Sequence, residues 1–458
     1  MNALLISAIL GVVMMFSSIL TGSKAVIRNL ALGGIALLLL VNILEMNGNI
    51  FFPFDTKGMM EFDRFSLLFT SIAFGSTLIY FLLSSRDMEK VGINLSEYFA
   101  LIFFILCGIV LVSSFRSLLI LFLGIEIISI PLYILTGSDK RNLKSNEASL
   151  KYFLLGSFST GLMLMGIALV YGSTGTFDTS IIGRISGKEP SVLLVAGILF
   201  LFFSMAFKAS VAPFHFWTPD VYDGAPTVFT SFMATIVKAA VFIAFIRLFD
   251  ESFGFIQSQW QLFIGIATVA TLFIGNITAV FQQSVKRMLA YSSIAQAGFM
   301  MMALYAMNAE GKEGLLLYTA AYSMATIGIF AVLTKMKDYT FDGFNGFARQ
   351  QPVLAATLTI FLLSLAGIPL TAGFLAKFYM IKAVMSTGSN LWLVIFAVLM
   401  AAVSVYYYFR LIQSMYFKDG EPQPIEVSLG FKWTLVILAA IIIVLGLFPN
   451  LLLYWYYF

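Results

Sequence analysis

Four ionisable residues stand where such residues are rare, inside long apolar stretches of the sequence. Lys208, Lys238 and Lys377 interrupt three of these stretches, and Glu126 lies in the middle of LLILFLGIEIISIPLYIL. On membrane-insertion scales, one charged residue at the centre of a membrane helix costs roughly 2.5–3.5 kcal/mol of insertion free energy. One carboxylate cannot neutralise three ammonium groups, and burial disfavours the charged form of lysine. Lysines that can lose and regain a proton inside a membrane predict a proton pathway.

A structural interpretation competes with this prediction. A buried Lys–Glu pair can be a static lock between helices, and for one lysine the two interpretations are equally good. A lock explains three lysines against one glutamate less well, so the residues favour the pathway.

The elements that carry these residues must be membrane helices. Of the 458 residues, 60% are hydrophobic and only 11% are charged, whereas a soluble domain is about 25% charged. A spanning helix needs about 20 mostly apolar residues. We therefore predict an all-α, polytopic membrane protein with about fourteen spans: 2–21, 29–46, 63–84, 98–114, 117–137, 150–172, 191–219, 225–249, 259–281, 288–307, 314–335, 353–386, 390–417 and 432–455.

The distribution of basic residues predicts the orientation. With fourteen spans, both termini lie on one side of the membrane. The loops on the opposite side carry 16 lysines and arginines, against 8 on the side of the termini. Basic loops favour the cytoplasm, so we expect both termini on the outer, periplasmic side of a bacterial cytoplasmic (inner) membrane. The apolar start of the chain lacks a cleavage pattern, and we interpret it as a retained helix.

Two of the predicted spans are too long for one straight helix and contain helix breakers. Residues 191–219 hold Lys208 followed by Pro213 and Pro219, and residues 353–386 hold Gly367 and Pro369 before Lys377. Proline removes a backbone donor and clashes with the preceding turn. A plain kink is one explanation. The functional explanation is a discontinuous helix whose freed backbone groups line an ion site.

The two breaks fall in the seventh and the twelfth spans, five spans apart. This spacing predicts two five-helix repeats, and an odd number of helices inverts the second relative to the first. The predicted units are 1–97 with three spans, 98–249 as the first repeat, 259–417 as the inverted second repeat, and 418–458 with the last span.

The chain offers little for redox or nucleotide chemistry. Cys107 and His215 are its only cysteine and its only histidine, too few for a zinc, haem or iron–sulfur site within the chain. No phosphate-binding glycine loop occurs in a strand-to-helix setting. We therefore expect no cofactor and no metal in this chain.

Three segments resemble a known family. They are FKASVAPFHFWTPDVYDGAPT at 207–227, GNITAVFQQSVKRMLAYSSIAQAG at 275–298, and GIPLTAGFLAKFY at 367–379. In order and spacing these segments are similar to the antiporter-like membrane subunits of respiratory complex I, the NADH-quinone oxidoreductases, and PDVYDGAPT favours the subunit N branch. The resemblance covers most of the chain and is strongest from about residue 116 to 380.

The resemblance implies roles for the same four residues. It implies that Glu126 pairs with Lys208, that Lys238 continues a polar axis, and that Lys377 ends a proton relay. It also implies that quinone reduction in neighbouring subunits drives proton translocation. FMN, iron–sulfur clusters and quinone are then expected in partner subunits of a hetero-oligomer, together with the lipid bilayer and without nucleic acid.

One position departs from the family pattern. Many relatives have a histidine after the Tyr-Ser-Ser motif of the tenth span, whereas this chain has Gln296. An amide can hydrogen-bond to water but cannot titrate near neutral pH. We therefore expect Gln296 to act, if at all, as a water-mediated link, which puts a chain made only of titrating side chains in doubt.

For other polar residues, a role in proton transfer is less strongly indicated. His215 is a candidate proton-uptake group, and a histidine that bonds a freed carbonyl near the helix break is an equally good interpretation. Asp220 and Asp223 are interpreted as solvated or helix-capping residues, and less favourably as part of a funnel. Lys286 and Arg287 are expected to mark the cytoplasmic interface and a helix start.

Three functions remain open at this point. The first is a proton-translocating subunit of a complex I type translocase. The second is a subunit of a multi-subunit cation/proton antiporter or of a membrane-bound hydrogenase, which would share the architecture. The third is a structural scaffold whose buried charges are silent.

Overall fold

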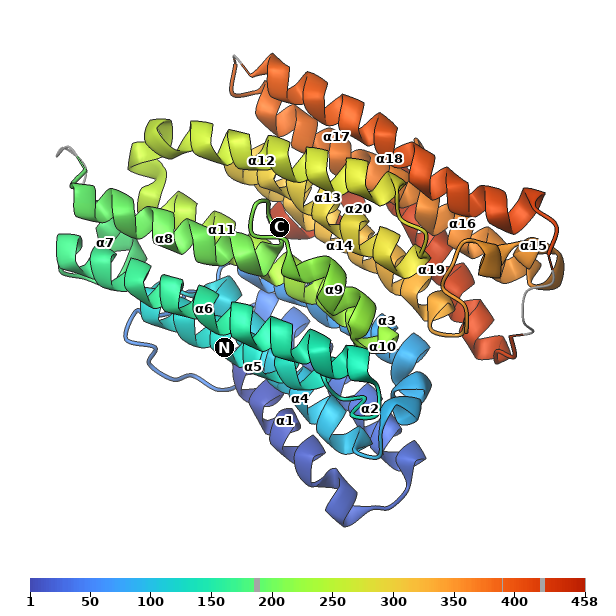
Figure 1. Ribbon diagram of the computed structural model, residues 1–458. Coiled ribbons are helices and arrows are strands. Elements are labelled where there is room, and N and C mark those ends of the chain that lie inside the picture. The colour runs from blue at the N-terminus through green and yellow to red at the C-terminus, as the bar shows by residue number, and fades with distance from the viewer. Residues whose placement is uncertain (185–189, 389, 421–424, 458) are drawn as a thin grey trace.

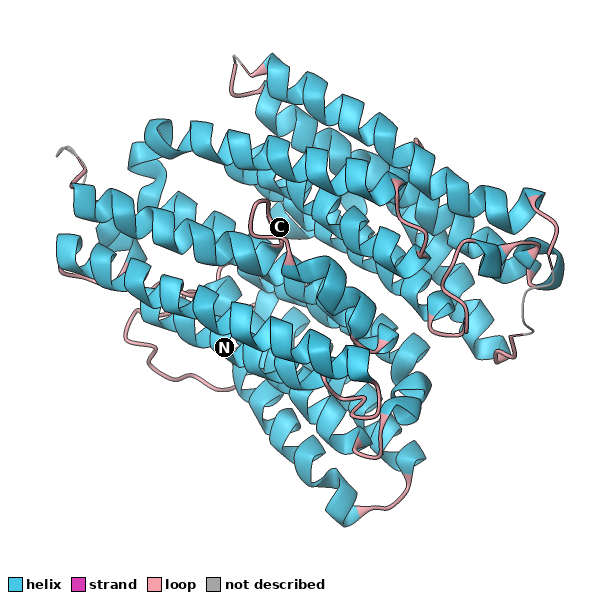
Figure 2. Cartoon of the chain, in the orientation of Figure 1, coloured by secondary structure: helices cyan, strands magenta, loops and turns pink. Residues whose placement is uncertain are grey.

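The fold is known from a computed structural model, which describes residues 1–184, 190–388, 390–420 and 425–457. Helices joined by short loops make up the described chain (Figure 1, Figure 2). β-pairing in these residues is limited to three isolated bridges, Met60 with Phe115, Ser117 with Asp178, and Ser284 with Thr340. The predicted all-α fold is therefore confirmed.

The first part of the chain forms the helices α1 (Asn2–Leu20), α2 (Lys24–Met46), α3 (Arg64–Val91), α4 (Leu95–Ser114), α5 (Leu118–Thr136), α6 (Leu143–Thr174), α7 (Thr179–Gly183), α8 (Val192–Ala209), α9 (Trp217–Gly224), α10 (Thr227–Phe232), the π-helix η1 (Met233–Val237) and α11 (Lys238–Phe253).

The remainder forms η2 (Gly254–Ile256), α12 (Gln257–Val280), α13 (Val285–Ala306), α14 (Ala309–Leu333), η3 (Asp342–Phe344), α15 (Phe347–Gln350), α16 (Pro352–Ala366), α17 (Ala372–Met385), α18 (Leu391–Phe417), α19 (Leu429–Leu447) and α20 (Asn450–Tyr457).

Twelve helical stretches in the described residues are long and apolar enough to cross a membrane. One of them, Thr227–Val280, is divided at η2 into a part that contains α10, η1 and α11 and a part formed by α12. Counting this stretch as two helices, and α16 with α17 as one broken helix, gives the predicted fourteen spans. The last predicted span, 432–455, is corrected: Pro449 lies between α19 and α20, so α19 alone is the long helix.

Both long spans are broken, as their prolines and glycines predict. After α8, Ser210 adopts a left-handed backbone (φ 62°), and after α16, Gly367 does the same (φ 83°). At both ends the amide one residue further on bonds back to a carbonyl of the last turn, Val211 to Ala206 at 2.8 Å and Ile368 to Leu363 at 3.0 Å. This is the usual termination of a helix, and each chain resumes as a helix after a few residues.

Both termini lie at the same end of the helix bundle, as an even number of spans requires. The amino group of Met1 pairs with Glu45 at the end of α2, and the Phe65 ring at the start of α3 lies 6.1 Å from the ring of Tyr456. Both contacts involve the ends of the α2–α3 connection.

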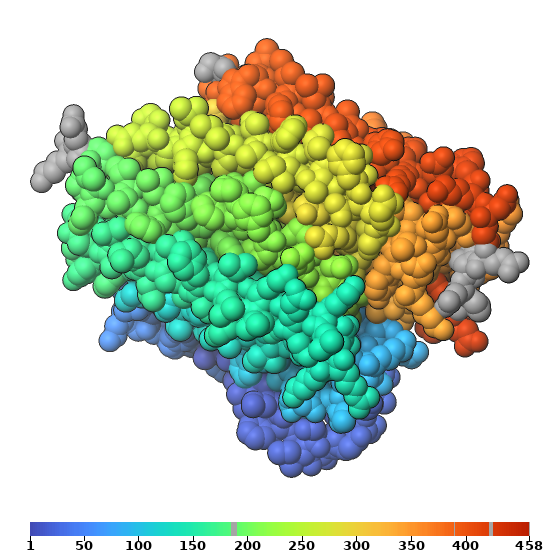
Figure 3. Space-filling model, viewed as in Figure 1, coloured from blue at the N-terminus to red at the C-terminus, as the bar shows by residue number. Residues whose placement is uncertain are grey.

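The most deeply buried helices form the centre of the bundle. The apolar windows of α14 and of the α10–α12 stretch are completely buried, whereas those of α1, α6 and α19 are about one-third buried or less. In the space-filling view the N-terminal residues form a projecting corner, and the other helices make one continuous body (Figure 3). Lys238 and Gln296, which are 1% and 2% exposed, lie in this interior.

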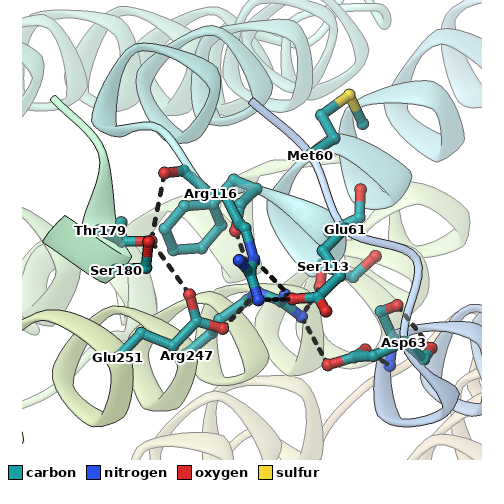
Figure 4. A network of polar contacts seen from close by, with 12 residues as sticks. Met60, Glu61, Asp63, Ser113, Arg116, Thr179, Ser180, Arg247 and Glu251 are labelled. Carbon is teal, nitrogen blue, oxygen red and sulfur yellow. Dashed lines mark hydrogen bonds and ion pairs between the residues drawn. The ribbon is translucent and has the colours of Figure 1, made fainter. Parts of the chain in front are cut away.

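A buried arginine connects several segments at one end of this bundle through ion pairs and hydrogen bonds. Arg247 on α11 is 4% exposed and contacts three carboxylates, Glu61 at 3.4 Å, Asp63 at 3.1 Å and Glu251 at 3.1 Å. It also donates to the carbonyls of Phe115 and Ser113, at 3.0 and 3.1 Å (Figure 4). Thr179 and Arg116 join the same network through Glu251 and Glu61, respectively. The network connects the loop before α3, the α4–α5 junction and the end of α11.

Candidate functional site: a row of buried lysines

Lys208 lies in the last turn of α8, directly before the helix break, and is 8% exposed. Its ammonium donates to the hydroxyl of Ser129 at 2.8 Å and to that of Tyr133 at 3.2 Å, both on α5. The end of a helix carries partial negative charge from its free carbonyls, which favours a cation there. The break and α5 together therefore position the lysine.

Glu126 lies on the same helix, one turn from Ser129, but it is only half buried. Its carboxylate accepts a hydrogen bond from Thr160 on α6 at 2.7 Å. The neighbouring positions Leu123 and Ile130 are 46% and 53% exposed. Glu126 is thus at the outer face of α5, which corrects the expectation that it is buried in the bundle.

The ion pair that the resemblance implies between Glu126 and Lys208 is not formed within 4 Å in the described structure. The two groups still interact electrostatically. Glu126, Ser129 and Tyr133 are spaced three and four residues apart, so they follow one face of α5. This face leads from the carboxylate at the surface to the ammonium inside.

Lys238 begins α11 immediately after the π-helix η1 and is 1% exposed. Its ammonium donates to both the carbonyl and the hydroxyl of Ser293 on α13, each at 2.9 Å, and lies 5.8 Å from the ring centre of Tyr222. A π-helix widens one turn and changes the direction of the following side chain. No local pattern in the sequence predicts this π-helix.

Lys377 lies on α17, after the second break, and is 6% exposed. Its ammonium donates to the carbonyl of Ala366 at 3.0 Å and lies 3.5 Å from the hydroxyl of Ser404 on α18. The ring centre of Phe299 is 4.8 Å away, a distance typical of a cation–π contact. The lysine thus bridges the break back to the last residue of α16.

Gln296 is held on three sides in the centre of the second half. Its amide nitrogen donates to the carbonyl of Leu365 and to the hydroxyl of Tyr408, each at 3.1 Å, and its oxygen accepts from Tyr318. A cavity of about 10 Å³ separates this group from Lys377, which is about the space of one water molecule. Gln296 and Lys377 line the same cavity, as a water-mediated link requires.

His215 is buried in the segment between α8 and α9, with 5% exposure. Its ring stacks on Phe216 with the centres 4.6 Å apart, and its Nδ1 has no hydrogen-bond partner in the described residues. No contact links it to one of the three lysines. Both interpretations of this residue, proton uptake and bonding of a freed carbonyl, therefore stay predictions.

Asp220 and its neighbours line a charged pocket of about 150 Å³ beside α9. Asp220 pairs with Lys151 and with Arg287, each at 3.1 Å. These contacts connect α9 to α6 and α13, so Asp220 is an ion-pairing residue instead of a freely solvated one.

Lys286 lies in the first turn of α13, as expected for a residue that marks a helix start. It is 3% exposed and donates to the carbonyls of Asp223 at 2.9 Å and Ala225 at 2.7 Å. It thereby satisfies carbonyls at the end of α9. Its position seven residues before Ser293 puts both on one face of α13.

The three lysines share one property. Each ammonium is bonded to hydroxyl or carbonyl oxygens, and none of them forms an ion pair with a carboxylate in the part of the chain that the structure describes. A hydroxyl can accept from an ammonium and donate to a neutral amine. Such sites can hold a lysine before and after it loses a proton. Within the same described residues, no group of three His, Cys, Asp or Glu side chains could hold a metal ion.

The fold and this row of lysines match known proteins. The family described as "NADH:quinone oxidoreductase/Mrp antiporter, TM" matches residues 116–404. The chain therefore belongs to this family of antiporter-like transmembrane subunits.

Relatives within the family narrow the assignment. The chain is 42% identical to NADH-quinone oxidoreductase subunit N of Cytophaga hutchinsonii, over 99% of both chains. It is 38% identical to the subunit N of Flavobacterium psychrophilum, again over 99% of both. Within its family, the chain is thus similar to the subunit N proteins over nearly its whole length.

Solved structures give the same result. A chain of respiratory complex I from Thermus thermophilus with bound aureothin superposes with a TM-score of 0.85 at 31% identity, covering 98% of each chain. A chain of the Mrp complex from Dietzia sp. DQ12-45-1b superposes with a TM-score of 0.87 at 17% identity, covering 99% of this chain and 95% of the other. At 17% identity, the match to the Mrp complex shows a shared fold and nothing more.

Proposed function

We propose that this chain is a proton-translocating membrane-arm subunit of an NADH:quinone oxidoreductase of the bacterial inner membrane, and that protons pass along Lys208, Lys238 and Lys377. The observation that carries the proposal is the bonding of these three ammonium groups to hydroxyl and carbonyl oxygens, without a carboxylate partner in the described residues. A buried ammonium without a counter-ion loses its proton more readily than one in water.

The three lysines act in sequence in this mechanism. Protons enter from the cytoplasmic side toward Lys208 and Lys238, and His215 and the charged pocket at Asp220 are candidates for the uptake route. The proton then moves from Lys238 toward Lys377, with Gln296 as a candidate water-mediated link, and leaves on the outer side. The chain itself supplies positions and hydrogen bonds, and electron transfer in partner subunits supplies the energy.

Glu126 controls the first lysine. It lies at the surface of α5 and interacts electrostatically with Lys208 without touching it. A half-exposed carboxylate between apolar positions at mid-helix is costly against lipid alone, so a neighbouring membrane subunit is expected to cover it. A change in that neighbour would move the carboxylate and shift the proton affinity of Lys208.

The topology belongs to the same proposal. The excess of basic residues places both termini on the outer side. Residues 98–249 and 259–417 form two inverted five-helix repeats, preceded by 1–97 and followed by 418–458. The two breaks support this division, because each follows a left-handed residue, Ser210 or Gly367, and each has a relay lysine beside it. FMN, iron–sulfur clusters and quinone belong to partner subunits.

A cation/proton antiporter subunit or a membrane-bound hydrogenase subunit is the alternative, and the likeness to the Mrp fold is the observation that favours it. Sodium-dependent transport without quinone reductase activity would support the antiporter. Nickel that co-purifies with the complex would support the hydrogenase.

Two variants test the relay in the assembled complex. Lys208→Met and Glu126→Gln each remove one ionisable group while approximately keeping its size. Proton uptake into vesicles, driven by NADH oxidation, should fall at least about tenfold for Lys208→Met, while the complex still assembles. Lys382→Met is the matched control, because Lys382 is also on α17 but is exposed, with its ammonium 5.8 Å from the ring centre of Tyr379.

The possible results separate relay from scaffold. Unchanged pumping in both variants would reject the relay and leave a structural role for the buried charges. To interpret a loss of pumping, the amount of assembled complex is measured on the same preparation.

A further inference from the structure

The most informative unexplained feature is a set of buried hydroxyl groups on α14. Thr319, Tyr322, Ser323 and Thr326 are all at most 3% exposed, and none of their hydroxyls forms a hydrogen bond of good geometry within the described residues. Buried polar atoms are nearly always bonded, to protein or to water. Four unsatisfied hydroxyls within eight residues of one helix therefore indicate bound water.

Tyr322 is the member of this set that lies between two lysines. Its side chain lines the cavity of about 10 Å³ that Lys377 also lines. On its other side its hydroxyl lies close to Ser293, and Ser293 is the residue that bonds the Lys238 ammonium at 2.9 Å. Tyr322 is thus adjacent to the partner of one relay lysine and to the cavity of the next.

Gln296 is less suited to carry a proton through this region. Both hydrogens of its amide are already donated, to Leu365 and Tyr408, and its oxygen accepts from Tyr318. An amide has no proton to release near neutral pH. These bonds hold Gln296 in one orientation at the side of the cavity, whereas the Tyr322 hydroxyl can both donate and accept a proton.

The cavity has the chemistry of a water site. A bound water needs about 10–15 Å³ and two to four polar partners. Tyr318, Tyr322, Ser364 and Lys377 line the cavity and offer hydroxyl oxygens and an ammonium. A metal cation is disfavoured at this place, because the ammonium of Lys377 would repel it.

We propose that one water molecule is bound in this cavity and that the Tyr322 hydroxyl, together with this water, connects Ser293 at Lys238 to Lys377. The inference rests on the proposed proton translocation and names its central link. In the step, the Lys238 ammonium gives a proton to the Ser293 hydroxyl, which passes its own proton to the Tyr322 hydroxyl. Tyr322 in turn passes its proton to the water, and the water gives one to Lys377, which receives it as a neutral amine. Lys238 ends neutral and Lys377 ends protonated, while the serine, the tyrosine and the water end as they began. No net charge stays on the tyrosine.

Two variants of the assembled complex, reconstituted in vesicles, test the link. Tyr322→Phe removes only the hydroxyl oxygen, and Ala321→Val fills the cavity that Ala321 lines without removing a polar group. Both should lower NADH-driven proton uptake about tenfold. Tyr80→Phe is the matched control, since Tyr80 is equally buried but bonds the carbonyl of Val228, at 3.1 Å, and its pumping should equal that of the wild type.

Cryo-electron microscopy of the wild-type complex at a resolution that shows waters gives an independent measurement. Density for one water in hydrogen-bond reach of both Tyr322 and Lys377 supports the proposal, and a dry cavity overturns it. Wild-type pumping by Tyr322→Phe also overturns it. Lys377→Met distinguishes the proposed lysine relay from the proposed Tyr322 link. If Lys377→Met abolishes pumping while Tyr322→Phe does not, the relay is supported and the link is rejected. Wild-type pumping by Lys377→Met would reject the relay itself.

Discussion

The ammonium of Lys377 on α17 donates a hydrogen bond to the carbonyl of Ala366, the last residue of α16, at 3.0 Å. The lysine therefore lies at the partially negative end of a half-helix, where free carbonyls favour a cation. Only a broken helix offers such an end in the middle of a membrane. The break thus provides a place where a lysine can hold a proton without a carboxylate.

Replacement of Lys377 by arginine should abolish pumping, although it keeps the positive charge. Arginine stays protonated at all physiological pH values, so it cannot pass the proton on. We expect NADH-driven proton uptake by reconstituted vesicles to fall at least about tenfold in Lys377→Arg, as in Lys377→Met. If only the charge mattered, arginine would retain pumping and methionine would not.

Replacement of Gly367 by alanine should disturb the second break and Lys377 together. Gly367 has φ +83°, and a Cβ there would lie 2.9 Å from Cδ of Lys377. A left-handed backbone costs a non-glycine residue about 1–2 kcal/mol, and the lysine would also have to move. The loss of pumping should therefore be larger than the loss of stability can explain. Proton uptake measures the first and thermal unfolding of the same complex measures the second.

Gly175→Ala is the control for this variant. Gly175 has a similar φ of +73° with nothing within 4 Å of an added Cβ, so it carries the backbone strain without the contact. An equal loss of pumping in both variants would show that strain, and not the position of Lys377, is responsible.

Asp178 predicts a local dependence on pH outside the membrane spans. Its carboxylate caps α7 by accepting from the amides of Ser180 at 2.8 Å and Ile181 at 3.1 Å. Burial raises the pKa of Asp178, but these two bonds and the bond from the Ser180 hydroxyl lower it by more. The net pKa therefore lies below the usual range of an aspartate. The folded form thus holds fewer protons than the unfolded form, and the stabilisation is present above pH ~4, the usual pKa of aspartate.

Hydrogen exchange of the Ser180 and Ile181 amides checks this expectation. Protection should persist down to about pH 4 and be lost as the pH falls through the lowered pKa of Asp178. Asp178→Asn should keep the cap without this pH dependence, because asparagine caps helices as well as aspartate does. Identical pH profiles for the two chains would contradict the assignment.

Much of the fold and of the lysine row could be predicted from the residues themselves. Apolar stretches with almost no charges define the spans, so Lys208, Lys238 and Lys377 stood out by contrast, and Pro213 and Gly367 indicated the breaks. These signals are local in sequence, because each depends on what lipid excludes.

Other parts depend on packing and could not be predicted this way. The π-helix before Lys238 consists of ordinary helix-forming residues, MATIV. Burial of Lys286 depends on how the end of α9 meets α13, and the exposure of Glu126 depends on which face of α5 is covered. The Arg247 network joins residues far apart in sequence, such as Glu61 and Glu251, and no local pattern marks it.

Arg247 should therefore be the residue of that network whose loss costs most stability. Removing it leaves the carboxylates of Glu61, Asp63 and Glu251 partly buried without their shared cation. Breaking a buried ion pair from one side typically costs about 3–5 kcal/mol. Arg247→Met should accordingly lower the unfolding temperature of the complex and expose the loop before α3 to protease.

Arg349→Met is the matched control, since Arg349 pairs with Asp419 at the surface at 2.8 Å, and exposed pairs contribute little. Adding Glu251→Gln to Arg247→Met should recover part of the loss if unpaired carboxylates cause it. No recovery would show instead that the bonds of Arg247 to the carbonyls of Phe115 and Ser113 hold the α4–α5 junction to α11.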